Sequence, residues 1–324
     1  MIYMLFDNPA DQKNMTFLNG YATAEICQVY PSRKCNSVRK MLAACKDMIQ
    51  QSADGDTIIC WYDFMAVLCW WLCKLHFKNR KMIALNILLK NKTTVKNKLV
   101  KFLYKPMLKS EKVQATVTSR KYGEYLNEIL GIQKNYILLH DVYHRSYSID
   151  YGGRIISNTV FCGGRNGRDW AQLIKIAQIM PEVIFNCVMP KDQFEQHKEH
   201  FGKNIVAQSD LSEEKFLALM CQSQLVVMPL DTEAPAGLIA FYQAASNGKM
   251  VITSDTVTTR EYLIEGRGAL CGENTEDWKN KIQYYLQHKE EANDCAVKLQ
   301  AFLEDECSEK KYATILWGML TECR

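Results

Sequence analysis

The sequence lacks a hydrophobic stretch long enough to cross a lipid bilayer. Its longest apolar run, residues 64–73, has about half the length that a membrane-spanning helix needs. Residues 1–6 are apolar, but no charged segment precedes them and no cleavage site follows, so they do not resemble a secretory signal. We therefore expect a cytoplasmic protein.

Short repeats, low-complexity segments and a disorder-prone composition are absent as well. The 324 residues are 48% hydrophobic and 23% charged, as in ordinary globular proteins, and such a length suits about two domains. The 13 cysteines are scattered and mostly lie in apolar runs, which favours buried free thiols in a reducing compartment. Cys69, Cys73 and His76 would share one face of a helix. Because no second pair of ligands follows, we expect core packing there rather than a metal site.

Positive and negative charges are unevenly distributed along the chain. Residues 1–145 carry 22 lysines and arginines against 11 acids, whereas the remainder carries 18 against 25. Within residues 74–112 there are twelve basic residues and one acid, Glu111, and aromatic residues lie among them. Residues 70–112 therefore fit contact with an anionic membrane surface, or else a well-solvated helical face over buried aromatics. We do not expect a nucleic acid partner.

Strand-like and helix-like segments alternate throughout, which predicts an α/β fold. Short apolar runs rich in β-branched residues indicate buried parallel strands, and amphipathic patterns between them indicate helices. The first half is predicted to have strands at residues 2–6, 57–61, 82–85, 115–117 and 136–139, with helices at 37–51, 64–76, 97–108 and 120–130. The second half is predicted to have strands at 159–162, 184–188, 225–228, 250–253 and 268–270, with helices at 170–179, 212–221, 238–246, 260–264, 275–288 and 290–303.

This pattern predicts two doubly wound, Rossmann-like domains, residues 1–150 and 151–308. We expect them to face each other across a cleft, because ligands of such sheets bind at the carboxyl ends of the strands.

Two segments of the second half carry most of the functional signal. Residues 160–170 read Val-Phe-Cys-Gly-Gly-Arg-Asn-Gly-Arg-Asp-Trp, a strand that ends in a glycine pair before a helix. Glycine lets the backbone approach a phosphate closely, and a helix N-terminus offers free N–H groups to an anion. Arg165 and Arg168 add forked donors that suit phosphate. The alternative is a tight turn with solvated arginines.

In the second segment, a strand ends at Pro229 and a loop leads into a helix that starts near Gly237. That helix ends at Gly248, a typical terminating residue, and the next strand follows at once. This order resembles the donor domain of GT-B glycosyltransferases, most closely the retaining enzymes of family 4. In that family a loop and helix ending in a Gly-Lys-Pro-Val-Ile stretch bind the nucleotide-sugar, and residues 248–252 here read Gly-Lys-Met-Val-Ile.

The resemblance covers most of residues 155–310. It implies that a final helix, residues 309–324, crosses back to the N-terminal domain. It also implies a retaining, metal-independent hexosyltransferase without a cofactor, which uses a nucleoside-diphosphate-sugar, with UDP-sugar favoured and GDP-sugar as the alternative. The acceptor would be a sugar hydroxyl of a glycan or lipid-linked molecule in surface polysaccharide synthesis. Such an enzyme would be peripheral on the inner face of the membrane.

By this resemblance Arg165 and Arg168 hold the diphosphate, and Arg168 stabilises the leaving group during catalysis. The expected donor site consists of Gly164, Arg165, Arg168, Met189, Gln208, Ala236, Gly237, Leu238 and Gln243. Gln243 stands where the family usually has a glutamate that grips the ribose, with a helix-surface amide as the alternative. Glu233 lies about two positions from the family's glutamate near the sugar. These departures leave a non-catalytic GT-B subunit that binds a partner or nucleotide as the second hypothesis.

On the acceptor side, polar residues follow two predicted strands of the first domain. Asp7 and Asn8 follow the first strand, and Tyr62 and Asp63 follow the second. Asp63 is our candidate for contacting or deprotonating the acceptor hydroxyl, with a helix N-cap as the alternative. Residues 54–56 spell the Asp-x-Asp of metal-dependent enzymes, but they lie in a polar turn before a strand, so we expect no metal site there.

Overall fold

A computed structural model describes all residues of the protein except 12–14, 22–24, 92 and 323–324. The chain forms two compact units. The first consists of residues 1–142 together with 309–324, and the second consists of residues 143–308. The chain thus leaves the first unit at Val142, ahead of the predicted boundary at residue 150, and its last helix returns to that unit.

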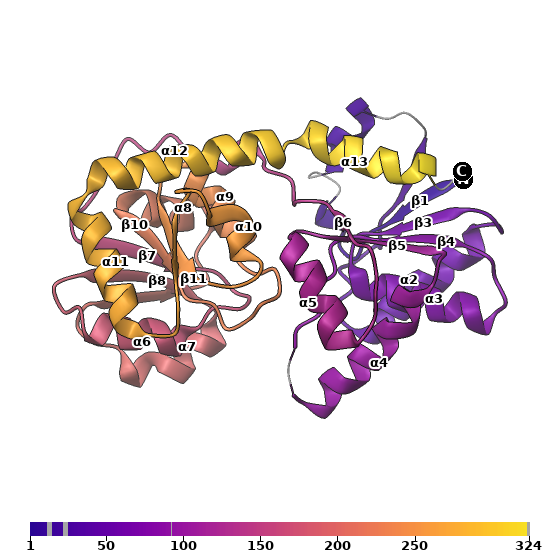
Figure 1. The fold of residues 1–324 in the computed structure, drawn as a ribbon, viewed down its shortest axis with the longest axis horizontal. Helices are drawn as coiled ribbons and strands as arrows, with labels where there is room; N and C mark the ends of the chain where they lie inside the picture. The colour runs from indigo at the N-terminus through magenta and orange to yellow at the C-terminus, as the bar shows by residue number, and fades with distance from the viewer. Residues whose placement is uncertain (12–14, 22–24, 92, 323–324) are drawn as a thin grey trace. The chain divides into compact units, whose positions relative to one another are not determined.

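The first unit is built on a parallel sheet with the strand order β2-β1-β3-β4-β5-β6 (Figure 1). Its strands are β1 (Ile2–Leu5), β2 (Ile26–Val29), β3 (Thr57–Cys60), β4 (Lys81–Ala84), β5 (Val113–Val117) and β6 (Ile137–Leu138). Its helices are η1 (Pro9–Asp11), η2 (Thr16–Tyr21), α2 (Val38–Gln51), α3 (Asp63–Leu75), α4 (Val95–Lys109), α5 (Arg120–Leu130) and α13 (Glu309–Glu322).

Helices α2, α3 and α4 form a layer on one face of this sheet, and α13 lies over the other face (Figure 1). The crossovers that carry these three helices all advance across the sheet in the same direction, and right-handed crossovers then place their helices on the same side. On the opposite face, Met4, Ile59 and Ile83 of three neighbouring strands pack with Leu316 and Trp317 of α13. The last helix therefore completes the core of the first unit.

The second unit is a parallel sheet in the order β12-β11-β10-β7-β8-β9. Its strands are β7 (Thr159–Gly163), β8 (Ile184–Met189), β9 (Ile205–Ser209), β10 (Leu225–Met228), β11 (Val251–Ser254) and β12 (Ala269–Cys271). Its helices are η3 (Arg145–Tyr147), α6 (Trp170–Gln178), α7 (Lys191–His197), η4 (Lys198–His200), α8 (Glu213–Gln222), α9 (Leu238–Ser246), α10 (Thr259–Leu263), α11 (Thr275–Gln287) and α12 (Lys289–Glu306).

Both faces of the second sheet are covered, as its apolar strands predict. Along β7, Val160 and Cys162 pack into one core cluster, whereas Phe161 between them packs into the other. Along β10, Val227 packs into the same cluster as Val160, and Val226 packs into the cluster of Phe161. Successive side chains of a strand point to opposite faces, so a strand between two helical layers must be apolar at every position. This requirement explains the continuous apolar runs in the sequence.

Strands β2 and β9 and helix α7 were not predicted from the sequence. β2 and β9 are edge strands whose side chains are mostly half-exposed, so each contains polar residues and lacks a clear apolar run. Gln208, one of the donor-site residues expected from the sequence, pairs with Val188 within the sheet.

Candidate functional site

The strand order of the second sheet brings the two predicted donor segments together. From β7 the chain proceeds outward on one side through β8 and β9, and it later returns to place β10 on the other side of β7. In such sheets the crevice at the carboxyl ends of the two strands where the direction reverses is the usual ligand site. The loop after β7, residues 164–169, and the loop after β10, residues 229–237, both begin at this point.

Backbone contacts join these two loops into one structure. Arg168 forms an isolated antiparallel bridge with Leu230. The Asp231 amide donates to the Gly167 carbonyl at 3.1 Å, and the Asp169 amide donates to the Pro229 carbonyl at 2.9 Å. Asp169 also caps α6, because its side chain accepts from the Gln172 amide. The Arg168 backbone is thereby fixed between two strand ends.

The guanidinium of Arg168 lies between two glycines of positive φ. A Cβ atom on Gly164 (φ 133°) would lie 2.6 Å from Nη2, and one on Gly237 (φ 78°) would lie 2.5 Å from Nη1. Any side chain at either glycine would therefore occupy the space of the guanidinium. Both glycines are required by conformation and by this close approach.

Arg168 is a buried cation with an unused donor. The side chain is 7% exposed, Nε donates to the Gly163 carbonyl at 2.8 Å, and buried Nη1 has no hydrogen-bond partner. Burial lowers the pKa of the Arg168 guanidinium. A buried charge is normally paired, and an unpaired one destabilises the folded state by on the order of several kcal/mol. An anion placed against Nη1 would satisfy both the charge and the free donor.

The N-terminus of α9 lies beside this unsatisfied nitrogen. Gly237 is the N-cap of α9, so no side chain caps the helix, and the first-turn N–H groups remain available to an anion. Ala236 and Leu238 on either side of Gly237 are buried. The uncapped N-terminus of α9 and the Arg168 guanidinium thus lie together where the sequence predicted a diphosphate.

The remaining donor-site candidates are distributed around this centre. Arg165 is exposed in the loop after β7. Gln243 is buried in α9, which contradicts the alternative of a helix-surface amide. Met189 ends β8 and packs in the hydrophobic core, which favours a structural role over contact with a nucleotide base. Gln208 is half-buried in β9.

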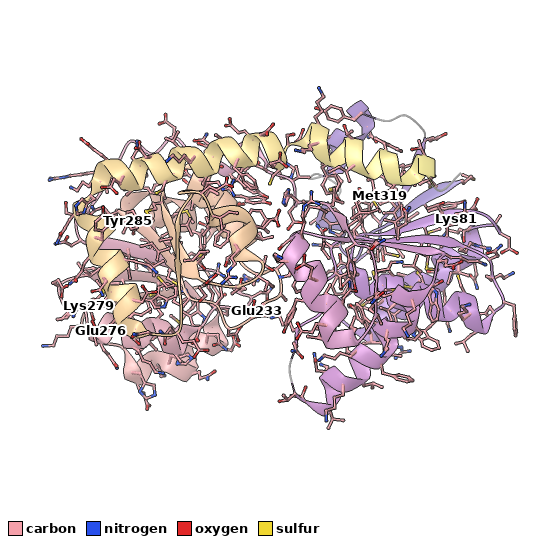
Figure 2. The ribbon with its side chains drawn as sticks, in the orientation of Figure 1. Lys81, Glu233, Glu276, Lys279, Tyr285 and Met319 are labelled. Atoms are coloured by element: carbon pink, nitrogen blue, oxygen red, sulfur yellow. The ribbon has the colours of Figure 1, made fainter. Side chains whose placement is uncertain are left out.

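A third loop, which the sequence did not connect with the site, braces the loop after β10. Glu233, labelled in Figure 2, accepts from the Val257 amide at 2.7 Å, and its own carbonyl accepts from the Thr258 hydroxyl at 2.7 Å. The Ser254 hydroxyl accepts from the Leu230 amide at 2.8 Å. Residues of the turn after β11 therefore hold the loop that presents Gly237. The small-residue segment after residue 253 was the sequence signal for this contact.

In the first unit, the predicted acceptor residues also lie at a reversal of strand order. The sheet places β1 between β2 and β3, so the residues after β1 and β3 lie at adjacent carboxyl ends. Asp7 is half-buried, and burial raises its pKa. Asn8 accepts from the Ala10 amide at 3.2 Å. Burial, together with the charges of Asp63 and Asp7, raises the pKa of Tyr62.

The contacts of Asp63 favour a structural role rather than catalysis. Its carboxylate is buried and accepts from the Leu88 amide at 2.8 Å, the Tyr104 hydroxyl at 2.8 Å and the Phe64 amide at 2.9 Å. It is the first residue of α3 and Tyr62 is the N-cap, so the N-cap alternative is off by one position. Burial raises the pKa of Asp63 to about 6. The carboxylate ties the start of α3 to α4 and to the segment after β4.

The Asp-x-Asp sequence forms the predicted turn. Asp54 pairs with Arg80 and Asp56 pairs with the chain's amino group, at the amino end of β3. Within the described residues, no group of three histidine, cysteine, aspartate or glutamate side chains could hold a metal ion. The cysteines that the structure describes are unpaired, and all but Cys27 are buried.

Comparison with known proteins supports the same architecture. Residues 168–315 match a family model described as "Glycosyl transferase-like". Sucrose-phosphate synthase from Thermosynechococcus elongatus has a similar structure, with a TM-score of 0.78 and 13% identity, over 99% of this chain and 98% of that one. HepE from Anabaena, in complex with UDP and glucose, gives a TM-score of 0.72 and 12% identity over 98% and 99% of the two chains.

A third similar structure is the pneumococcal O-GlcNAc transferase GtfA in complex with UDP and GlcNAc. Its TM-score is 0.63 and its identity 13%, over 88% of this chain and 60% of that one. No curated protein matches the chain by sequence. At these identities the structural likeness establishes the fold, which is the two-sheet architecture predicted from the sequence.

Proposed function

We propose that this chain is a GT-B glycosyltransferase that transfers a hexose from a UDP-sugar to a hydroxyl group of a glycan or lipid-linked acceptor. The observation that carries the proposal is Nη1 of Arg168, a buried guanidinium nitrogen without a partner beside the uncapped N-terminus of α9. A diphosphate supplies the negative charge that this place lacks.

The chemistry follows from where charge develops. As the bond between the sugar and the diphosphate breaks, negative charge grows on the leaving phosphate oxygen. Donors that are already oriented toward that oxygen lower the barrier without reorganisation, and one such donor contributes about 3 kcal/mol. Arg168, fixed between Gly164 and Gly237, and the amides of the first turn of α9 meet this requirement. Exposed Arg165 would close over the diphosphate from the solvent side.

Because these groups supply fixed positive charge, we propose that the transfer needs no metal. The preference for a uridine nucleotide is supported by structural neighbours that bind UDP and UDP-glucose. Retention at the transferred sugar follows from the resemblance to family 4 and remains part of the proposal.

On the acceptor side we propose that Asp7, rather than Asp63, meets the attacking hydroxyl. The Asp63 carboxylate already accepts three hydrogen bonds from the protein, whereas Asp7 is half-buried at the adjacent strand end. A glycan or lipid-linked acceptor fits an enzyme of surface polysaccharide synthesis that works at a membrane. Within the described ranges, no helix has both the length and the apolar character needed to cross a membrane.

The test begins with nucleotide binding by the purified full-length protein. We expect UDP to raise the melting temperature more than GDP, CDP or dTDP, and UDP-glucose or another UDP-hexose to be consumed in the presence of EDTA. Turnover that EDTA abolishes would contradict the metal-free transfer. A melting temperature that no nucleotide raises would contradict the donor site itself.

A second candidate is a non-catalytic GT-B subunit. It is favoured by Glu233, whose carboxylate accepts from a backbone amide of a neighbouring loop. This alternative predicts a melting shift with UDP but no hydrolysis or transfer with any UDP-hexose, and an unchanged result for Asp7→Asn. The enzyme hypothesis predicts that Asp7→Asn slows transfer while the UDP shift is kept.

A further inference from the structure

The outer face of α4 is apolar although it is not used in folding. Val95, Leu99 and Phe102 are 83%, 58% and 66% exposed, and they follow one another at helical spacings of four and three residues. The opposite face of the same helix supplies the buried contacts to the sheet, through Tyr104 and Met107 among others. A helix of a soluble domain needs one apolar face for its core, so the second face has no structural explanation.

Lysines border this stripe and no acid interrupts them. At about 100° per residue, exposed Lys98 and Lys109 lie within about 80° of the stripe on one side, and exposed Lys96 lies on the other. None of the fifteen residues of α4 is acidic. An exposed apolar stripe with cationic flanks is the pattern of a helix that lies in a membrane surface.

The end of α3, in the same helical layer, has a second exposed apolar group. Phe77 is 93% exposed and has a left-handed backbone (φ 53°) directly after the helix cap. Glycine or asparagine is favoured at such a position, and the phenyl ring gains no packing in return. Exposed Leu75 precedes it. Strain of this kind without a structural benefit is typical of functional positions.

A basic cavity opens at this turn. It has a volume of about 570 Å³, and Lys46, Lys78, His76 and Arg80 contribute to its lining, with no acid among the lining residues, although Arg80 pairs with Asp54 beside it. The lining residues belong to the ends of α2 and α3 and to the segments before β3 and β4, so the cavity lies at the amino edge of the sheet and apart from Asp7. Its charge suits the phosphate of a headgroup.

We infer that the outer face of α4 and the Phe77 turn together form a docking surface for an anionic lipid bilayer. The apolar stripe enters the boundary between headgroups and acyl chains, and the flanking lysines contact lipid phosphates. The inference deepens the proposed function, on which it rests for the role of a membrane-held acceptor. The observed chemistry favours a bilayer over a nucleic acid, since Leu99 and Phe102 would be buried against a charged backbone there.

The structure also corrects the interpretation of the basic segment. Of the aromatics near residues 70–112, Tyr104 is buried and Trp71 donates to the Leu103 carbonyl at 3.2 Å, so these two hold α3 and α4 in place. The exposed apolar groups are instead Phe77, Phe102 and the aliphatic residues of the α4 stripe. The aromatics buried inside the layer fit the alternative of a solvated helical face, and the exposed apolar side chains outside it are those of the inferred membrane surface.

The experiment is vesicle flotation of the full-length protein with phosphatidylcholine alone or mixed with phosphatidylglycerol. We expect binding only to the anionic vesicles, with an apparent affinity that falls as salt is raised. Leu99→Ser with Phe102→Ser should weaken binding at least tenfold. Lys98→Gln with Lys109→Gln should weaken it about 25-fold, because each lysine near an anionic surface contributes about fivefold.

Matched controls lie in the second unit. Val297 on α12 and Lys203 are exposed, and Val297→Ser or Lys203→Glu should leave flotation unchanged. Each variant is also checked for its melting shift with UDP, which reports on folding and on the donor site separately. Loss of flotation with the UDP shift kept is the expected result for the α4 variants.

Three results would overturn the inference. The first is equal flotation of the wild type and the Leu99→Ser/Phe102→Ser variant, and the second is no binding to anionic vesicles. The third is an oligonucleotide that binds as tightly as the vesicles and needs only the lysines, which would identify a polyanion surface. If flotation behaves as expected but UDP gives no melting shift, the proposed donor site fails while the membrane surface stands.

Discussion

Replacing Arg168 with methionine should have opposite effects on the empty protein and on nucleotide binding. Arg168 holds a buried positive charge, and one of its guanidinium nitrogens has no partner. If Arg168 serves to bind a diphosphate, it should destabilise the folded protein when no ligand is bound. If it exists to stabilise the fold, its removal must weaken the fold.

The stability effect can be bounded from the contacts. Methionine removes the hydrogen bond from Nε to the Gly163 carbonyl, which contributes roughly 1.5–3 kcal/mol for a charged donor. It also removes an unpaired buried cation, and apolar replacement of buried ions is often neutral or stabilising by about 1–4 kcal/mol. The second range is already net of the ion's own hydrogen bonds, so we expect the empty Arg168→Met protein to range from unchanged to more stable by up to about 4 kcal/mol.

The binding effect is larger and has the opposite sign. A ligand at about 100 times its dissociation constant stabilises the folded state by roughly 2.7 kcal/mol. If the lost charge contact contributes about 3 kcal/mol, affinity falls by about two orders of magnitude, and the same UDP concentration stabilises by only about 0.4 kcal/mol. For a domain of this size, roughly 2–4 °C of melting shift correspond to each kcal/mol. A shift of about 5–10 °C should thus shrink to about 1 °C.

Differential scanning fluorimetry with and without UDP measures both effects on one sample. Arg267→Met is the matched control, because Arg267 stacks on Phe302 at 4.0 Å and pairs with Glu265 at 3.6 Å within the same unit. The control should lower the melting temperature and keep the UDP shift. An Arg168→Met protein that melts several degrees lower, yet keeps the full UDP shift, would refute the reasoning.

Three further predictions follow from single contacts. Gly237→Ala introduces a Cβ atom 2.5 Å from the Arg168 guanidinium and should weaken UDP binding at least tenfold by calorimetry. The control is Gly248→Ala, which also has a positive φ but has open space around it. This control should lose only about 1–2 kcal/mol of stability and bind UDP normally. Burial raises the pKa of Asp63 to about 6 from 3.8, so the unfolded chain releases this proton at lower pH than the folded chain. The stability of the wild type should therefore fall by roughly 3 kcal/mol between about pH 4 and 7 relative to Asp63→Asn. Equal pH profiles of the two proteins in urea denaturation would contradict this. Glu233→Ala removes the acceptor for the Val257 amide. The free energy of unfolding should fall by about 1–3 kcal/mol, and protease cleavage within residues 229–237 should increase. An unchanged cleavage pattern would argue against the bracing role.

Much of the proposed donor site could be predicted from the sequence because its chemistry is local. A strand that ends in glycines, a nearby arginine and a helix that begins with glycine are all contained in segments of about ten residues. Their meaning depends on backbone freedom and helix-end charge, which are properties of the segments themselves. The continuous apolar runs likewise predicted strands buried on both faces, since a strand between two helical layers has no polar side.

The roles of individual polar residues were decided by contacts between distant segments. Arg165 and Arg168 are chemically equivalent in the sequence, yet only Arg168 is buried, because the loop after β10 folds over it. The sequence suggested that Asp63 could act as a base. In the structure its carboxylate accepts hydrogen bonds from Leu88 and Tyr104, which lie 25 and 41 residues away. The outer stripe of α4 could not be separated from its inner stripe by periodicity, since both are apolar. Packing against the sheet decides which face is buried, and that depends on the position of the helix in the fold.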